Sequence, residues 1–248
     1  MGLSYIALGV GDAFSARHYS ACLAVESGGR WLLIDCPHPI RKVLREGSLE
    51  SKAGLDVGSF DAVVITHIHG DHCSGLEGFG LYAYFALEQR VMLAMHPESS
   101  RRLWDGRLAG GMDSIADNQT WGPVPRAFGD YFDLTALDDT KPVQIGPFRI
   151  ETRRTLHHVP TYALRIHAGG KTLGVSADTA YDAGLIDWLS GCDAIVHETG
   201  HGIHTPYAKL AALPAELRRK MRLTHMPDDL DLTDGKVEPL VQGRRYGV

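Results

Sequence analysis

The stretch Val63–Gly75, VVITHIHGDHCSG, constrains this chain more than any other part of its sequence. Its apolar, β-branched start predicts a buried strand, and four polar groups follow within six positions, namely His67, His69, Asp71 and His72. Open α/β sheets bind ligands at the carboxyl ends of their strands, so this cluster is well placed. His67 and His69 are two positions apart and point the same way in an extended chain. Asp71 and His72 then face a different point, which indicates two metal ions rather than one.

Three more candidate ligands follow predicted strands: His157 in RTLHHVP, Asp178 in GVSADTA and His225 in RLTHMPD. Imidazole nitrogen and carboxylate oxygen are ligands that Zn²⁺, Mn²⁺ and Fe²⁺ share, so the residue types leave the metal open. Each of the three alone is typical of a capping or hydrogen-bonded residue, and a His-rich surface loop is the alternative for the first four. Together the seven are enough for two ions with one bridging carboxylate.

Apolar runs alternate with turn signals along the chain, which predicts one α/β domain over residues 1–248. Strands are predicted at 4–10, 21–27, 30–36, 60–67, 90–96, 148–157, 161–170, 171–178 and 192–199, and helices at 39–47, 71–89, 97–108 and 181–191. Residues 214–225 read as a helix running into a strand, and Gly28-Gly29 and Gly169-Gly170 predict hairpin turns. The segment at about 110–147 is the least regular and is predicted to be a cap-like insertion.

Composition narrows the class of protein further. The net charge of −5 lacks the basic footprint of a nucleic-acid binder, so no large nucleic acid is expected as a partner. The four scattered cysteines, Cys22, Cys36, Cys73 and Cys192, contain no C-x-x-C pair and indicate a reduced, intracellular protein. Without a signal peptide pattern or an apolar run of about 20 residues, we expect a cytoplasmic protein that makes no membrane contact.

The H-x-H-x-D-H motif and the later histidines and aspartate resemble the metallo-β-lactamase superfamily, over nearly the whole chain. The resemblance implies a four-layer αββα sandwich with two divalent ions, of which Zn²⁺ is favoured and Mn²⁺ or Fe²⁺ are alternatives. Carried over by position, the first ion is held by His67, His69 and His157, the second by Asp71, His72 and His225, and Asp178 bridges them. Spacing to PTYALRI favours His157 over His158, but leaves both open. A hydroxide shared by the ions is the expected nucleophile.

The segment IVHETGHGIHTPYAKLAA resembles the ribonuclease Z and phosphodiesterase branch of this superfamily. His197-Glu198 matches the His-Glu that ends a strand there, and His204-Thr205 matches the His-Ser/Thr element that opens a helix. The branch implies that His204 is a general acid or phosphate ligand oriented by Glu198, and it implies a homodimer. With Asp71, these two are the candidate catalytic residues. Alternatively His197, His201 and His204 are loop histidines at a rim.

The chain departs from ribonuclease Z between His157 and Asp178, where there is room only for a hairpin and not for a long arm that grips transfer RNA. We therefore expect a small phosphodiester substrate, a cyclic nucleotide or a nucleotide-like ester. The aromatic residues Trp104, Trp121, Phe128, Tyr131 and Phe132 either wall a pocket for a ring or form the core of the insertion. Arg17, His18 and Tyr162 are further candidates to meet a substrate anion.

Other functions are open to the same ligands. Two metal ions could hydrolyse a carboxylic ester, a lactone or a β-lactam. A mononuclear iron oxidoreductase is disfavoured because both Asp71 and His72 are present, and a non-catalytic sensor is disfavoured because none of the seven ligands is missing. Cys73 beside His72 is interpreted as a packing residue, since no nucleophile triad can be assembled around it.

Overall fold

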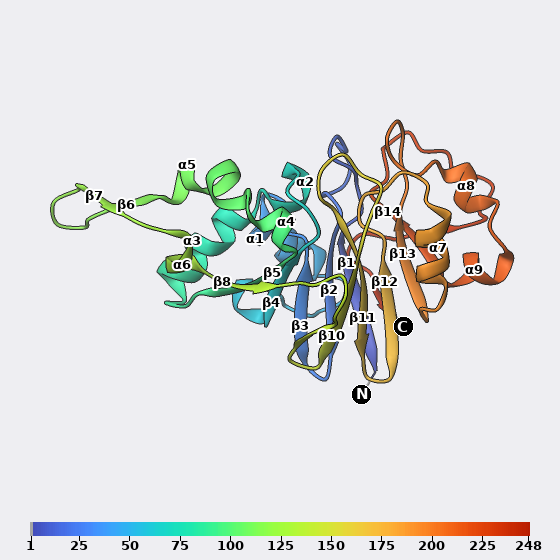
Figure 1. Ribbon diagram of the computed structural model, residues 1–248, viewed down its shortest axis with the longest axis horizontal. Helices are drawn as coiled ribbons and strands as arrows, with labels where there is room; N and C mark the ends of the chain where they lie inside the picture. The colour runs from blue at the N-terminus through green and yellow to red at the C-terminus, as the bar shows by residue number, and fades with distance from the viewer. Residues whose placement is uncertain (1) are drawn as a thin grey trace.

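The computed structural model describes residues 2–248, which form two seven-stranded β-sheets packed face to face with helices on both outer sides (Figure 1). The first sheet has the order β16 (Arg245–Gly247), β1 (Leu3–Gly9), β2 (Cys22–Ser27), β3 (Arg30–Ile34), β4 (Ala62–Ile65), β5 (Val91–Met95) and β8 (Phe132–Ala136). The second has the order β15 (Glu238–Pro239), β14 (Met221–Thr224), β13 (Ala194–Glu198), β12 (Lys171–Val175), β11 (Tyr162–Ala168), β10 (Phe148–Arg154) and β9 (Val143–Ile145). The predicted αββα sandwich is confirmed.

The helices form the two outer layers. Those that precede Phe132 are α1 (Ile40–Gly47), the 3₁₀ turn η1 (Val57–Ser59), α2 (Gly70–Cys73), α3 (Leu76–Ala86), α4 (Pro97–Ser100), the π-helical turn η2 (Trp104–Leu108), α5 (Ala109–Met112) and α6 (Phe128–Tyr131). The others are α7 (Ala183–Ser190), α8 (Tyr207–Ala211) and α9 (Ala215–Lys220), which lie outside the second sheet (Figure 1). Within residues 2–248, no helix is long and apolar enough to span a membrane.

Strand β1 shows why the apolar runs fold into a sandwich. Tyr5 and Ala7 belong to the hydrophobic cluster between the two sheets. The residues between and after them, Ile6 and Leu8, belong to the cluster between the first sheet and its helices. Successive side chains of a strand point to opposite faces, and here both faces are covered. The result is a continuous apolar run in place of an alternating pattern.

Strand direction collects the polar loops at one edge of the sandwich. Strands β3, β4, β5 and β8 run parallel in the first sheet, and β12, β13 and β14 run parallel in the second. The segments that follow parallel neighbours begin at the same edge of a sheet. Figure 1 shows α2, which follows β4, at the same edge as the loop that follows β13. Six of the seven predicted ligands are carried by these segments, and the seventh, His157, follows β10.

The helix predicted over residues 71–89 is divided in two. Helix α2 ends at Cys73, and α3 runs from Leu76 to Ala86. Between them Gly75 donates its N–H to the carbonyl of Cys36 at 2.7 Å. A Cβ at Gly75 would lie 2.5 Å from the carbonyl oxygen of Pro37, so only glycine allows this close backbone approach. The contact holds the polar loop after β4 against the loop after β3.

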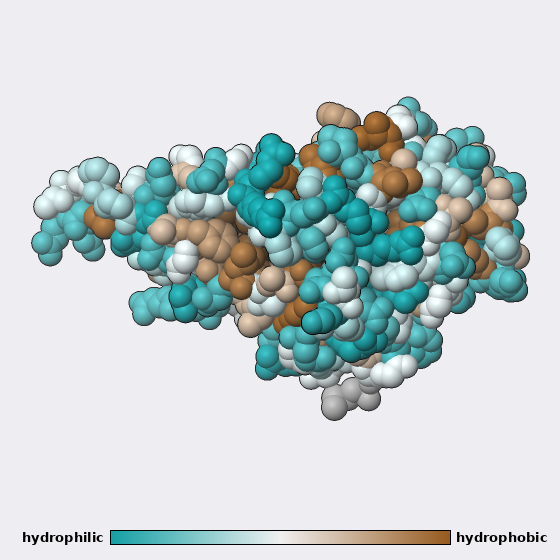
Figure 2. All heavy atoms as spheres, viewed as in Figure 1, coloured by the Kyte–Doolittle hydropathy of each residue, from teal (hydrophilic) through white to brown (hydrophobic). Residues whose placement is uncertain are grey.

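The segment at 110–147 differs from the predicted cap. Its strand β8 pairs with β5 and its strand β9 pairs with β10, so both sheets gain an edge strand from it. Only the hairpin of β6 (Ser114–Ala116) and β7 (Pro123–Pro125) projects from the sandwich (Figure 1). Hydrophilic residues cover most of this hairpin (Figure 2).

The aromatic residues of this region are mainly core. Tyr131 and Phe132 are buried, and Trp104 and Phe128 pack against the same cluster outside the first sheet. Their rings contact each other, with Phe128 and Phe132 centroids 5.2 Å apart. Trp121, in the projecting hairpin, is 80% exposed. Of the two interpretations, the core of the insertion therefore describes the four packed aromatics, and the pocket wall does not.

Replacing Gly75 should destabilise the fold. In Gly75→Ala the new Cβ meets backbone carbonyl groups that cannot rotate away, so we expect a loss of about 1–3 kcal/mol in the free energy of unfolding. Gly78→Ala is the matched control on the same helix, because a Cβ there meets nothing within 4 Å. That change should stabilise the protein by about 0.5–1 kcal/mol. Chemical denaturation of both variants measures the difference, and equal stability would contradict the close approach at Gly75.

Candidate metal centre

The seven predicted ligands lie together at the edge where the polar loops meet. Two groups of donor atoms, each within 4.8 Å of one another, share Asp178. The first cluster is His67, His69, His157 and Asp178, and the second cluster is Asp71, His72, Asp178 and His225. These residues follow β4, β10, β12 and β14, four strands taken from both sheets. The first and last of them, His67 and His225, are 158 positions apart in the sequence, so only the fold brings them together.

The first cluster is built around the Nδ1 atom of His69. His67 Nε2 lies 3.1 Å from that atom, and His157 Nε2 lies 3.3 Å from it. Asp178 Oδ2 completes the cluster at 3.6 Å from His67 Nε2 and 3.9 Å from His157 Nε2. Three imidazoles and a carboxylate oxygen thus converge on one point, which is the donor set of many zinc sites.

The second cluster is built around two carboxylates. Asp71 Oδ2 lies 3.2 Å from His72 Nε2 and 3.1 Å from His225 Nε2. Asp178 Oδ1 lies 3.3 Å from His72 Nε2, and Asp178 Oδ2 lies 3.6 Å from His225 Nε2. Asp178 therefore faces both clusters, which is the position a bridging ligand needs.

Polar atoms without partners indicate that the clusters fit metal ions. Within residues 2–248, His72 Nε2 and Asp178 Oδ1 are buried, and neither has a hydrogen-bond partner of good geometry. A buried polar group without a partner is costly, and native proteins rarely leave one without a reason. Two such atoms 3.3 Å apart in one cluster fit a site whose missing partner is a cation.

The pKa values of the first cluster favour neutral imidazoles. Burial lowers the pKa of His67 well below its usual value and lowers the pKa of His157 to about 4. Burial also lowers the pKa of His69. A metal ion binds the neutral form of histidine, so these three side chains are held in the state that a ligand needs.

In the second cluster the pKa of His72 is raised instead of lowered, because this cluster contains more carboxylates. Burial alone would lower the pKa of His72, but Asp178, Asp35 and Asp71 outweigh burial and raise it well above its usual value. Burial would raise the pKa of Asp178, but His72 and His225 outweigh it and hold that pKa well below the usual range. Protonated imidazoles thus neutralise the buried carboxylates. Metal binding displaces protons of this kind.

Asp35 supports the second cluster and is absent from the predicted set. Its Oδ2 accepts a hydrogen bond from His72 Nδ1 at 2.8 Å, and its Oδ1 accepts one from the backbone N–H of Thr66 at 2.8 Å. A proton held on Nδ1 leaves His72 Nε2 free to face the cluster. The signal was available, because Asp35 follows the apolar run WLLI just as the predicted ligands follow theirs.

Backbone strain also gathers at this site. Asp35, Ala177 and His225 have φ values of 60°, 50° and 56°, in the left-handed region that residues other than glycine seldom adopt. Each lies in the segment directly after a strand that ends at the metal centre. Strain of this kind persists only where surrounding structure imposes it, and it is common at functional sites.

Glu198 and His204 form a pair at the edge of the second cluster. Glu198 is 1% exposed, and its Oε1 accepts hydrogen bonds from the backbone N–H of Thr179 at 2.8 Å and of Thr205 at 3.3 Å. His204 Nδ1 lies 3.3 Å from the same oxygen and 4.0 Å from Asp178 Oδ2. Burial lowers the pKa of His204, but Glu198 outweighs burial and raises it. His204 is thus oriented by Glu198 and faces the metal centre.

The other histidines of this region differ in whether they reach the clusters. His157 belongs to the first cluster, whereas His158 lies outside it and contacts His69 Nε2 at 3.1 Å. The side chain of His201 is 66% exposed and pairs with Asp229 instead of the clusters. His197 is buried, and its Nδ1 bonds to the carbonyl of Glu198 at 2.6 Å. Only His204 of the three loop candidates reaches the metal centre.

The remaining candidates from the sequence are Tyr162, Arg17, His18 and Cys73. Tyr162 is buried, and its hydroxyl donates to Glu98 Oε2 at 2.8 Å, so this group is already occupied. Arg17 and His18 line a hollow of about 460 Å³, where Arg17 Nη1 donates to the carbonyl of Asp228 at 3.0 Å. Burial raises the pKa of the Cys73 thiol to about 11, which agrees with a packing role.

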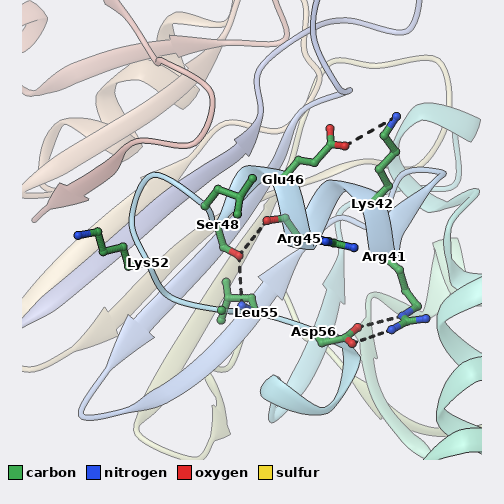
Figure 3. Close-up of a pocket in the computed structure, with 10 residues that line it drawn as sticks. Arg41, Lys42, Arg45, Glu46, Ser48, Lys52, Leu55 and Asp56 are labelled. Atoms are coloured by element: carbon green, nitrogen blue, oxygen red, sulfur yellow. Dashed lines mark hydrogen bonds and ion pairs between the residues drawn. The ribbon is translucent and has the colours of Figure 1, made fainter.

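A second hollow, of about 910 Å³, lies against α1 (Figure 3). Two of its four cationic side chains are paired, since Arg41 bonds to Asp56 at 2.8 Å and Lys42 lies 3.8 Å from Glu46, and the other two are Arg45 and Lys52. Its lining contains none of the cluster residues. This hollow is therefore separate from the metal centre.

The sandwich and its paired clusters define a metal-dependent hydrolase of the metallo-β-lactamase fold. The YhfI protein of Bacillus subtilis has this fold and superimposes with a TM-score of 0.79 at 18% identity, over 100% of both chains. The short form of human tRNase Z superimposes with a TM-score of 0.67 at 16% identity, over 98% of both chains.

The sequence model of the family described as "Anti-Pycsar protein Apyc1" matches residues 3–242 of this chain. The Anti-Pycsar protein Apyc1 of Paenibacillus sp. (strain J14) is 32% identical to it, over 93% of this chain and 92% of that protein. The chain belongs to the Anti-Pycsar protein Apyc1 family. It is a phosphodiesterase-type hydrolase, and the predicted branch of the superfamily is confirmed.

Removing the carboxylate of Asp35 should weaken metal binding. Asn tolerates positive φ, so Asp35→Asn preserves the backbone, but its amide cannot accept hydrogen bonds from both Thr66 and His72. We expect one of two metal-binding steps to weaken by about 10- to 100-fold. Calorimetric titration of metal-stripped protein with Zn²⁺ measures both steps. Asp133→Asn is the control, since Asp133 is an exposed partner of Arg90. Two unchanged steps in Asp35→Asn would contradict the role of Asp35.

Proposed function

We propose that this chain hydrolyses a small phosphodiester, with a cyclic nucleotide as the first candidate, using two divalent ions held by the two clusters. The observation that carries the proposal is the position of Asp178, whose two oxygens face both clusters. Zn²⁺ is the favoured ion, and Mn²⁺ and Fe²⁺ suit the same donors. Two such ions lower the pKa of a bound water and neutralise charge on a phosphate.

The residues of the chain have distinct parts in this proposal. His67, His69 and His157 would hold one ion, Asp71, His72 and His225 the other, and Asp178 both. Asp71 stands at the second cluster with Oδ2 toward His225, and so orients that ligand. His204, kept protonated by Glu198, would hydrogen-bond a phosphate oxygen and give its Nε2 proton to the leaving oxygen.

The size of the substrate follows from the segment between His157 and Asp178. This segment is a β11–β12 hairpin closed at Gly169 and Gly170, whose φ values are 58° and 75°. It carries no arm that could hold a polymer at a distance from the metal centre. The net charge of −5 supports the same conclusion. A small substrate is therefore proposed, and the homodimer implied by the branch stays a prediction.

His204 should be needed for turnover and dispensable for metal binding. In His204→Gln the proton donor is lost, so turnover of bis(p-nitrophenyl) phosphate should fall by about 10²- to 10⁴-fold. Metal content, measured by mass spectrometry, should stay at the wild-type value, because His204 holds neither ion. His201→Gln is the matched control from the same loop, with an exposed imidazole. Equal activity in His204→Gln and His201→Gln would remove His204 from the mechanism.

A substrate panel distinguishes the proposed chemistry from its alternatives. Protein reloaded with Zn²⁺ or Mn²⁺ should hydrolyse 3′,5′-cyclic pyrimidine or purine nucleotides faster than a lactone or a carboxylic ester. Asp178→Ala should abolish this turnover, because both clusters lose their shared ligand. Product formation is followed by liquid chromatography. Turnover of lactones or esters alone would assign the same centre to acyl hydrolysis.

A further inference from the structure

His158 lies directly behind a ligand of the first cluster. His69 Nδ1 faces the cluster, at 3.1 Å from His67 Nε2 and 3.3 Å from His157 Nε2. The other ring nitrogen, His69 Nε2, lies 3.1 Å from His158 Nε2. The two nitrogens of His69 therefore have different partners, the cluster on one side and His158 on the other.

We propose that His158 is a positioning residue, which accepts a hydrogen bond from His69 Nε2–H and so keeps His69 Nδ1 without a proton. This inference rests on the proposed function, since it takes the first cluster to hold an ion. A neutral imidazole has one N–H and one bare nitrogen. Nδ1 can bind an ion only if the proton is on Nε2, and His158 Nε2 is the acceptor that the geometry supplies. His158 then carries its own proton on Nδ1.

The two clusters have outer partners of different chemistry. One histidine of the second cluster, His72, is held by the buried carboxylate of Asp35 at 2.8 Å. The outer partner of His69 is the imidazole of His158, an exposed residue. Partners of metal-binding histidines fix the tautomer and the ring orientation, and their loss weakens metal binding. Because Asp35 and His158 contact different ligands, the two clusters can be weakened separately.

His158 also differs from a ligand in its placement. The donor atoms of the first cluster include one from His157 and none from His158. The ring centroids of His69 and His158 are 4.7 Å apart and tilted by 36°, and those of His157 and His158 are 4.6 Å apart. His158 thus packs against two ligands from outside. A side chain at this position acts through His69 and not on the ion.

The test is calorimetric titration of the full-length, metal-stripped chain with Zn²⁺. In His158→Leu the acceptor is lost, and one of the two binding steps should weaken by about 10- to 100-fold. His158→Gln places an amide oxygen near the position of Nε2 and should restore that step to within a few-fold of wild type. Asp35→Asn should weaken the other step. Circular dichroism of the stripped His158 variants should show that both are folded, as expected for a change at an exposed residue.

Three results would overturn the role of His158. The first is a Zn²⁺ titration of His158→Leu that equals that of wild type. The second is a His158→Leu variant that weakens the same binding step as Asp35→Asn. The third is a His158→Gln variant that binds Zn²⁺ no more tightly than His158→Leu. The proposed function fails separately, if wild-type protein does not bind two ions. Wild-type protein that binds two ions, with His158→Leu unchanged, would overturn only the inference about His158.

Discussion

The buried carboxylate of Asp178 is the constraint on which the rest of the site depends. It is 2% exposed, and its oxygens lie 3.3 Å from His72 Nε2 and 3.6 Å from the Nε2 atoms of His67 and His225. An isolated charge in such a place would be very costly, so it must be surrounded by positive or polar groups. Imidazoles from two separate segments, after β4 and after β14, supply them. Each of these segments has to begin at the same edge of the sandwich, and the parallel strands of both sheets achieve this.

Several features of the fold follow from the need to hold these segments in place. Gly75 lets the loop after β4 approach the loop after β3 at backbone distance, and the Asp35 side chain then spans the two loops to reach Thr66 and His72. On the other side Glu198 ties the loops after β12 and β13 through Thr179 and Thr205. The residues with positive φ angles, Asp35, Ala177 and His225, lie in the loops after β3, β12 and β14 at this site.

The same sandwich is shared with solved structures at 16–18% identity, so the fold by itself does not define a substrate. The features of this chain that bear on its substrate are its loops. The short β11–β12 hairpin leaves the metal centre without an arm, and the Glu198–His204 pair lies beside the clusters. The β6–β7 hairpin projects away from the sandwich and presents an exposed Trp121. Family membership and these loops together lead to the proposal of a small phosphodiester.

Patterns of a few consecutive residues predicted most of the strands and the metal-ligand candidates. The apolar runs gave most of the strands of both sheets, because a strand buried on both faces needs consecutive apolar residues whatever its partners are. The H-x-H-x-D-H spacing indicated two directions for the ligands, since backbone geometry sets where side chains two positions apart point. Strand-end position then suggested His157, Asp178 and His225, and the structure brings all seven candidates together.

Tertiary structure decided what depends on partners distant in sequence. β16 has three residues and forms by pairing with β1, and β8 and β9 turn the supposed cap into sheet edges. The neighbours His157 and His158 are equivalent in composition, and only the position of His69 places one inside the cluster and the other behind it. Sequence alone determined the ligand types and the local geometry that carries them, because these are properties of a few consecutive residues. The fold decided which atoms meet, because contacts between distant segments depend on how two sheets pack.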